Sequence, residues 1–434
     1  MPTFREAAQF WIKLGFINFG GPAGQIALMH RELVDKRAWI SDDAFLRALN
    51  FCMLLPGPEA QQLATYIGWR LHGVRGGVLA GTAFVLPSVF VLLALSWLAV
   101  AGRDNRPVQA MFYGVQAVVV AIVAEAVLRL GRRAIRHRAL LFFSAAAFIA
   151  IYVFSVPFPL IVFAAALAGS LLSKKWPLVF QMNNVASSQA RQDSNAPKGG
   201  ARRLLKLTAI FLALWLLVAA PLVAFRSADD VLTREAFFFT KAAFITFGGA
   251  YAVLSYIADV AVHDFHWLTT EQMVQGLGLA ESTPGPLIMV TQYVGFMGAW
   301  NHAGARDPLA NAIAGSLITT YVTFLPCFFF IFAGAPYIER LTTNARLQAA
   351  LSSVTAAVVG VILNLGVFFA TRVLLHPAER LTPLGSARNF IAGLPIDPVA
   401  CGIAIAAFIA ITRFKLPVQW AVVAGALLGL LIRN

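Results

Sequence analysis

The sequence contains little charge. Only 12% of its 434 residues are Asp, Glu, Lys or Arg, whereas 59% are hydrophobic, and the mean hydropathy is +0.74. A soluble globular protein of this size needs more polar residues to cover its surface. The composition therefore excludes a soluble cytosolic enzyme.

Cysteines and enzymatic motifs are also scarce. The three cysteines, Cys52, Cys327 and Cys401, lie in apolar stretches without CxxC spacing, so neither a disulfide framework nor a zinc site is indicated. The sequence has no P-loop, GxSxG or HExxH motif, which opposes an ATP-driven pump and a hydrolase. We therefore expect no catalytic residues, no metal site and no cofactor.

Acidic residues are outnumbered, with 20 Asp and Glu against 34 Lys and Arg. The basic excess lies in a few loops, which is typical of cytoplasmic loops of membrane proteins and not of a nucleic-acid-binding surface. Between these loops are apolar runs near twenty residues long, enough to cross a hydrocarbon core of about 30 Å. The runs cover 76–100, 108–128, 204–223, 317–334, 349–370 and 418–432. We expect a multi-pass protein whose partner is the lipid bilayer.

The chain repeats itself. FINFGGPAGQ at 16–25 returns as FITFGGAYAV at 244–253, and the same offset of 228 pairs Lys13 with Lys241. Further matches follow in the same order over nearly the whole chain. We predict repeats at 1–175 and 230–434, a flexible cytoplasmic linker at 176–203, and a connecting transmembrane helix at 204–225.

A single connecting helix would bring the second repeat into the membrane from the opposite side, if each repeat makes an even number of full crossings. The predicted fold is an all-α polytopic membrane protein with two inverted repeats and broken, re-entrant helices, as in many secondary transporters. Making the first two segments of each half re-entrant places more than twice as many Lys and Arg inside as outside. Letting them cross fully lowers this contrast. The favoured arrangement has nine full crossings, an inner N-terminus and an outer C-terminus.

Paired glycine and proline breaks are the most informative positions. Gly20-Gly21-Pro22 corresponds to Gly248-Gly249, and Pro56-Gly57-Pro58 corresponds to Pro284-Gly285-Pro286. Broken helix backbone is tolerated at membrane depth only where protein or water satisfies it. Each break should start a half-helix, whose free N–H groups and dipole form an anion site. A simple proline kink is the alternative.

Polar side chains near the breaks could complete such a site. Lys13 and Lys241 lie seven residues before Gly20 and Gly248, on the same helical face, and could supply positive charge or extend to the membrane surface. Uncharged groups nearby could bind the anion or merely join helices. They are Asn18, Gln25, Gln61, Gln62, Tyr66, Thr246, Thr283, Thr291, Gln292 and Tyr293.

Two acidic residues flank the second pair of breaks. Glu59 follows the first PGP and Glu281 precedes the second, so the repeat does not keep the acid in one place. Each could be a helix cap or a proton carrier. Glu125 lies four residues before Arg129, which favours a helical ion pair.

The motifs FGGPAGQ and LLPGPEAQQLATYIG, with their echoes FGGAYAV and STPGPLIMVTQYVG, resemble the chromate ion transporter family in its long, two-domain form. The resemblance covers essentially the whole chain. It implies an inner-membrane protein of bacteria that exports chromate from the cytoplasm and confers chromate resistance, with sulfate as a close analogue. Its motifs imply functional roles for Gly20, Gly21, Pro22, Gly24, Gln25, Gly248, Gly249, Pro56, Gly57, Pro58, Gln61, Gln62, Pro284, Gly285, Pro286 and Gln292.

Other functions stay open on the sequence. An exporter of sulfate or another oxyanion would need similar donors, and antiport with protons could use Glu59 or Glu281. A flippase or enzyme acting on a lipid phosphate could use the same half-helix ends. The sequence leaves open whether the protein forms a homodimer.

Overall fold

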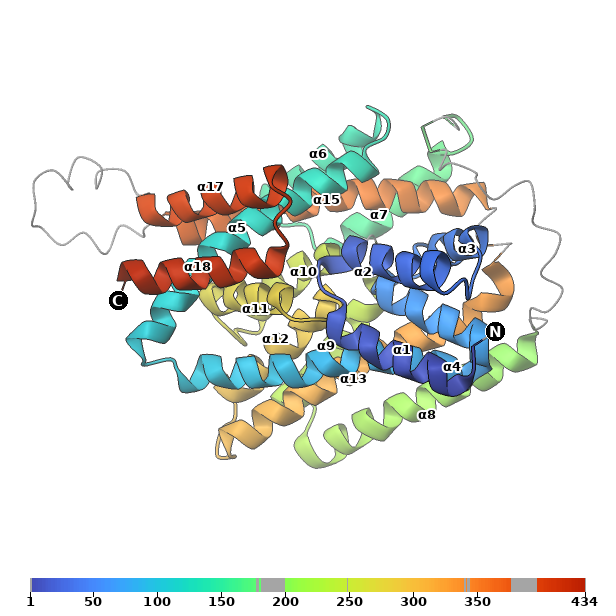
Figure 1. Ribbon diagram of the computed structural model, residues 1–434, viewed down its shortest axis with the longest axis horizontal. Coiled ribbons are helices and arrows are strands. Elements are labelled where there is room, and N and C mark those ends of the chain that lie inside the picture. The colour runs from blue at the N-terminus through green and yellow to red at the C-terminus, as the bar shows by residue number, and fades with distance from the viewer. Residues whose placement is uncertain are drawn as a thin grey trace, which may run out of the picture.

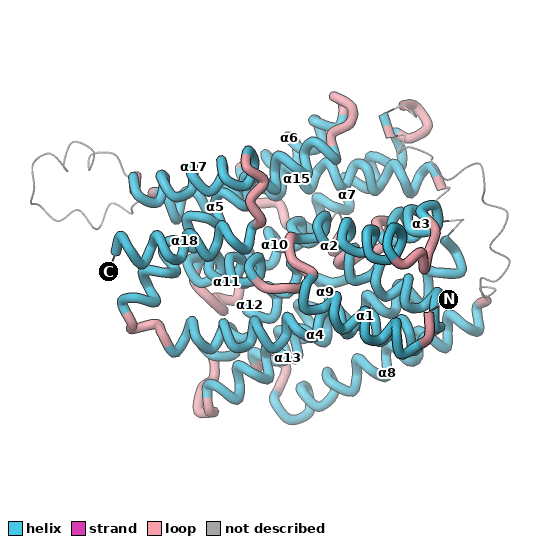
Figure 2. Tube along the Cα trace, viewed as in Figure 1, coloured by secondary structure: helices cyan, strands magenta, loops and turns pink. Residues whose placement is uncertain are grey.

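The computed structural model describes residues 2–176, 179–180, 200–247, 249–338, 341, 344–375 and 396–433. Within these ranges the regular secondary structure is helical, apart from one isolated bridge between Leu375 and Ile396 (Figure 2). The prediction of an all-α membrane protein is confirmed at this level.

The elements of the first half recur in the second half in the same order. The first half contains α1 (Phe4–Ile17), α2 (Gly21–His30), the π-helix η1 (Arg31–Lys36), α3 (Asp42–Cys52), α4 (Glu59–Ala101), α5 (Arg106–Ala134), α6 (Leu140–Tyr152) and α7 (Phe158–Leu172). After α8 (Ala201–Arg226), the second half contains α9 (Val231–Ile245), α10 (Ala250–Asp259), the π-helix η3 (Val260–Asp264), α11 (Thr270–Ser282), the 3₁₀ turn η4 (Leu287–Met289), α12 (Val290–Asn301), α13 (Pro308–Gly334), the 3₁₀ turn η5 (Ala335–Tyr337), α15 (Ala345–Leu374), α17 (Pro398–Arg413) and α18 (Val418–Arg433). Even the π-helical turn after α2 has its counterpart after α10.

The long helix α4 reverses direction within its length. His72 and Gly73 have non-helical backbone angles, and Gly73 has φ +63°. A Cβ built on Gly68 would lie 2.6 Å from the Cβ of Ala80, twelve residues along the chain, a proximity that a straight helix does not allow. The segments 59–71 and 74–101 are therefore antiparallel, like α12 and α13, where Gly295 faces Gly315.

Five helices in the described residues are long and apolar enough to cross a membrane: α4, α5, α8, α13 and α15. They contain the first five predicted apolar runs. The other apolar helices, α6, α7, α17 and α18, have 13 to 16 residues. At 1.5 Å per residue they are shorter than a hydrocarbon core of about 30 Å. Five of the described helices are thus long enough for a full crossing, and the arrangement with nine full crossings remains a prediction.

The two halves are packed into each other. The α6–α7 pair of the first half packs on α15, and the α17–α18 pair packs on α5. Small residues allow this close approach: Gly114 of α5 meets Gly425 of α18, and Gly169 of α7 meets Ser353 of α15. Figure 1 shows the N- and C-termini at opposite ends of the long axis, with α8 along one side.

Candidate functional site

A helix begins after each of the four breaks, as predicted. Gly20 caps α2 with φ +93° and Gly249 caps α10 with φ +97°, and neither helix start has a side-chain cap. Gly248 lies outside the described residues. Pro22 lies in the first turn of α2, whereas Pro58 and Pro286 are the N-cap residues of α4 and η4. Pro22 is thus the second residue of its helix, one position after the predicted one, and Pro58 and Pro286 stand just before the first.

The breaks of the two halves are hydrogen-bonded to each other. The N–H of Gly57 donates to the carbonyl oxygen of Thr246 (2.8 Å), and the N–H of Gly285 donates to the carbonyl oxygen of Asn18 (3.3 Å). These donors correspond to each other in the repeat, and so do the acceptors. Each PGP loop is therefore bound to the broken helix of the opposite half, and α1, α2, α9 and α10 meet in the central part of the molecule (Figure 1).

Buried amide side chains reinforce this junction. Nε2 of Gln25 donates to the carbonyl oxygens of Asn18 (2.9 Å) and Gly285 (2.5 Å), which joins both halves. Nδ2 of Asn18 donates to the backbone carbonyl oxygen of Phe84. Nε2 of Gln62 donates to the carbonyl oxygen of Pro56 within its own loop, and Nε2 of Gln292 donates to the carbonyl oxygen of Val89 across the halves.

The side-chain donors of the junction are thus used on the protein itself. Gln61 donates to the hydroxyl oxygen of Thr65, and the hydroxyls of Thr246, Thr283 and Thr291 donate to backbone carbonyls of the preceding turn. On the predicted amide residues, the atoms without a partner are the side-chain oxygens, which are acceptors, of Asn18, Gln25, Gln61, Gln62 and Gln292. An anion needs donors. Two kinds of donor remain near the breaks: the backbone N–H groups at the uncapped helix starts, and the buried, unpartnered hydroxyl of Ser88 beside Gly285.

The four breaks differ in accessibility. Gly20, Gly21, Pro22 and Gly24 are half-buried, and Ala23 is exposed. Residues 56–58 and 283–286 are buried. At the start of α10, Gly249 is half-buried and Ala250 and Tyr251 are buried. Among the described residues, the start of α2 is therefore the most accessible half-helix end.

The two repeated lysines do not line the buried junction. Lys13 on α1 and Lys241 on α9 both have exposed side chains. Neither has an ion-pair partner among the described residues. Their place beside an anion path remains a prediction.

An arginine instead approaches the second half's breaks. Oε2 of Glu125 lies 3.4 Å from Nε of Arg129, which confirms the predicted ion pair. Arg129 also interacts with Tyr251 and Glu281, and the Tyr251 hydroxyl donates to Oε1 of Glu281. Tyr251 is in the first turn of α10, and buried Glu281 precedes the second PGP loop. The contacts of Arg129 with Tyr251 and Glu281 were not predicted from the sequence, because an ion pair with Glu125 already accounted for the arginine.

Glu59 occupies a different environment from Glu281. It is the first residue of α4 and is half-buried, and the charge of Arg133 acts on it. Arg133 also donates to Sδ of Met53 in the preceding loop (3.1 Å). The α5 helix therefore carries one arginine toward each candidate proton carrier.

Comparison with known proteins adds the family. The chain is 29% identical over 387 residues to the chromate transport protein of Cupriavidus metallidurans, covering 88% of this chain and 86% of that protein. It is 30% identical to a probable chromate transport protein of Synechococcus elongatus, covering 83% of both chains. It is 33% identical to the chromate transport protein of Pseudomonas aeruginosa, covering 81% of this chain and 77% of that one. No solved structure matches.

The profile of the family described as chromate transporter matches two segments, residues 5–170 and 234–430. These segments cover α1 to α7 and α9 to α18 except for one to three residues at their ends, and the helix between them is α8. The resemblance noted in the motifs is thus confirmed by matches that span both halves, and the chain belongs to the chromate transporter family.

Proposed function

We propose that this protein exports the chromate dianion from the bacterial cytoplasm across the inner membrane and so confers chromate resistance. The observation that carries the proposal is the reciprocal pair of hydrogen bonds, Gly57 to Thr246 and Gly285 to Asn18, in a chain of this family. It brings the breaks of both halves to one place. Export is electrically favourable, because a dianion leaving a negative interior gains roughly 4.6 kcal/mol per 100 mV.

The proposed topology is an inverted repeat. In each half the two helices joined by the first break, and the two helices joined by the second break, enter and leave the membrane on one side. Two long helices then cross it. The single crossing of α8 starts the second half on the opposite side, with the N-terminus inside and the C-terminus outside. The opposite positions of the termini along the long axis support this arrangement (Figure 1).

The proposed anion site is the start of α2, because it is the accessible helix end and has no side-chain cap. Gly20, Gly21, Ala23 and Gly24 supply N–H groups, and the helix start supplies the positive end of the helix dipole. Gln25 fixes this turn against Gly285. Pro56 to Pro58, Gln61, Gln62 and Thr246, with Thr283 to Pro286 and Gln292, hold the junction rather than the anion.

A charged variant and its neutral isostere test this site. Ala23 is exposed in the first turn of α2, so either substitution should fold. Ala23→Asp puts a carboxylate where the anion binds, and we expect at least a tenfold loss of radiolabelled chromate uptake into everted vesicles. Ala23→Asn should keep most of the uptake. Equal effects would remove the anion from the α2 start, and absent wild-type uptake would refute export.

The selectivity for chromate over sulfate and the coupling to protons require separate experiments. Excess sulfate in the same assay measures competition, and strong inhibition would broaden the substrate to tetrahedral oxyanions in general.

We propose that export is coupled to proton entry through Glu59 or Glu281. Glu59→Gln and Glu281→Gln should then change the pH dependence of uptake. An unchanged pH profile in both variants would exclude proton antiport through these residues.

A further inference from the structure

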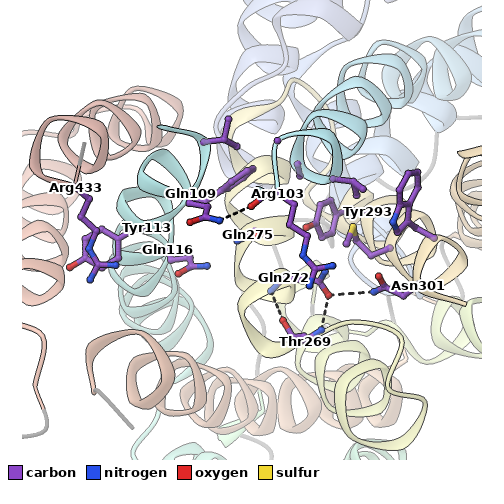
Figure 3. Close-up of a pocket in the computed structure, with 17 residues that line it drawn as sticks. Arg103, Gln109, Tyr113, Gln116, Thr269, Gln272, Gln275, Tyr293, Asn301 and Arg433 are labelled. Carbon is purple, nitrogen blue, oxygen red and sulfur yellow. Dashed lines mark hydrogen bonds between the residues drawn. The ribbon is translucent and has the colours of Figure 1, made fainter. Parts of the chain in front are cut away.

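A polar cavity lies apart from the helix breaks (Figure 3). Its volume is about 340 Å³, and it lies between the end of α4, the start of α5, α11 and α12. Arg103 in the α4–α5 turn, Asn301 at the end of α12 and Arg433 near the C-terminus all line it. The cavity therefore opens at the end of the molecule that carries the C-terminus, and both halves contribute to it.

The lining is rich in positive charge and in hydrogen-bond donors. It includes two arginines and, among the described lining residues, no Asp or Glu. Its uncharged polar members are Gln109, Tyr113, Gln116, Thr269, Gln272, Gln275, Tyr293 and Asn301. In a protein with few charges, a cavity with this composition favours an anionic ligand.

The two arginines differ in what they contact. Arg433 lies 3.3 Å from Oδ2 of Asp397 and stacks 3.6 Å above the centre of the Tyr113 ring, so its charge is already paired. Arg103 has no ion-pair partner among the described residues. Figure 3 shows Arg103 with Gln272, Tyr293 and Asn301 on one side of the cavity, away from Arg433 and Tyr113. Arg103 is the cation available to a ligand.

Tyr293 supplies the second, independent observation. Its side chain is 0% exposed, it lines the cavity, and its hydroxyl has no hydrogen-bond partner. A buried hydroxyl without a partner costs about 1–3 kcal/mol, so such groups usually serve a ligand or water. Its ring packs on Gly276, which fixes the hydroxyl in place.

Gln272 adds a donor that is held in position. Its Oε1 accepts hydrogen bonds from the N–H of Thr269 (2.9 Å) and from Nδ2 of Asn301 (3.5 Å). Its Nε2 amide group has no hydrogen-bond partner among the described residues, so it is free to donate. A guanidinium, a phenol and an amide thus converge on one volume, which suits the several oxygens of a tetrahedral oxyanion.

We propose that this cavity is a second oxyanion-binding site on the outer face, where the transported dianion stops before release. The assignment to the outer face rests on the proposed function. Tyr293 lies on α12, seven residues beyond Pro286 of the second break. The cavity and the central junction are therefore connected by this short stretch of helix.

Protection of a single thiol tests the site. Gln275→Cys is placed in a Cys401→Ser background, because Cys52 and Cys327 are buried and Cys401 is the accessible native thiol. Spheroplasts are treated with a membrane-impermeant thiol reagent, with and without molybdate, a tetrahedral dianion that does not oxidise thiols. We expect molybdate to slow labelling at least threefold. Arg103→Gln and Tyr293→Phe should each remove most of this protection.

Arg106→Gln is the matched control, because Arg106 is exposed nearby but does not line the cavity. It should leave the protection intact. Absent protection, or equal protection with Arg103→Gln, would overturn the second site, and labelling only in everted vesicles would overturn its outer position. Wild-type chromate uptake is measured in parallel: uptake without protection refutes this site alone, and protection without uptake refutes the export proposal alone.

Discussion

Gly57 and Gly285 have the same backbone angle, φ +126°, at corresponding points of the two halves. Side chains rarely adopt this angle, and here the space is filled as well. A Cβ on Gly57 would lie 2.7 Å from Nε2 of Gln62, whereas a Cβ on Gly285 would lie 2.6 Å from the Cβ of Ser88. The first neighbour is the end of a flexible side chain, and the second is fixed to the backbone.

We therefore expect Gly285→Ala to be more harmful than Gly57→Ala. Each variant carries roughly 1–3 kcal/mol of backbone strain, so both should lower the thermal unfolding midpoint in detergent. Chromate uptake should fall at least tenfold for Gly285→Ala. Gly304→Ala is the control, because Gly304 also has positive φ (+64°) but has nothing within 4 Å of the added Cβ. If all three variants behave alike, crowding at the PGP loops does not matter.

Glu235 is a buried acid that the junction does not use. Its side chain is 0% exposed, and neither carboxylate oxygen has a hydrogen-bond donor. It lies where α9 meets the hairpin of α12 and α13, beside Gly298 and Gly315. In the repeat its counterpart is Ala7, so the acid belongs to the second half only.

A neutral side chain of the same shape should be tolerated at this position, because an unpaired buried charge costs several kcal/mol. We expect Glu235→Gln to keep the unfolding midpoint in detergent at or above the wild-type value. Glu235→Ala should lower it, because truncation leaves a cavity. If Glu235→Gln lowered the free energy of unfolding by more than about 2 kcal/mol, the carboxyl group would have a partner in the membrane-embedded protein.

Among the elements, α4 has the greatest effect on topology. Its reversal at His72 and Gly73 divides an apparent 43-residue helix into a half-length segment and a long one. Gly68 and Gly76 permit the backbones to touch, and Gly295 with Gly315 do the same between α12 and α13. The hairpin thus occurs in both halves, and in the proposed topology it returns the chain to the membrane surface before a full crossing.

A thiol placed at this turn distinguishes the hairpin from a continuous crossing. Val74 is 55% exposed and directly follows the turn. In a Cys401→Ser background, Val74→Cys should react with an impermeant reagent in everted vesicles and not in spheroplasts. Lack of reaction from both sides would place residue 74 within the hydrocarbon core and contradict the hairpin topology.

At the scale of the whole molecule, the halves interlock and neither has a complete surface of its own. The α17–α18 pair covers α5, and the α6–α7 pair covers α15. The largest hydrophobic cluster draws on residues of both halves, including Leu92, Val118, Phe239 and Ile362. If the halves were expressed separately, each would leave exposed the apolar helix faces that the other half covers in the intact protein.

The termini should lie on opposite sides of the membrane. Alkaline phosphatase fused after the C-terminus should be active, and green fluorescent protein fused there should be dark in cells that export it through the general secretory route. Fusions at the N-terminus should show the reverse. Active phosphatase at both ends, or at neither, would contradict the single crossing of α8 and with it the inversion.

The sequence by itself determined the membrane class, the duplication, the positions of the breaks and the Glu125–Arg129 pair. These features depend on composition, on repeated letters and on neighbours within a turn or two, so they are local. It also identified the prolines and glycines that start α2, α4, α10 and η4. Gly and Pro fix the backbone wherever they stand, whatever packs around them.

Only the tertiary structure decided which distant groups meet. The exchange of hydrogen bonds between the halves, the reach of Arg129 to Tyr251 and Glu281, and the cavity around Arg103 all join residues from separate helices. The exposed positions of Lys13 and Lys241, outside the buried junction, are likewise a result of how the helices pack. Helix pairing follows the fit of whole surfaces, and a periodic apolar pattern does not specify its partner.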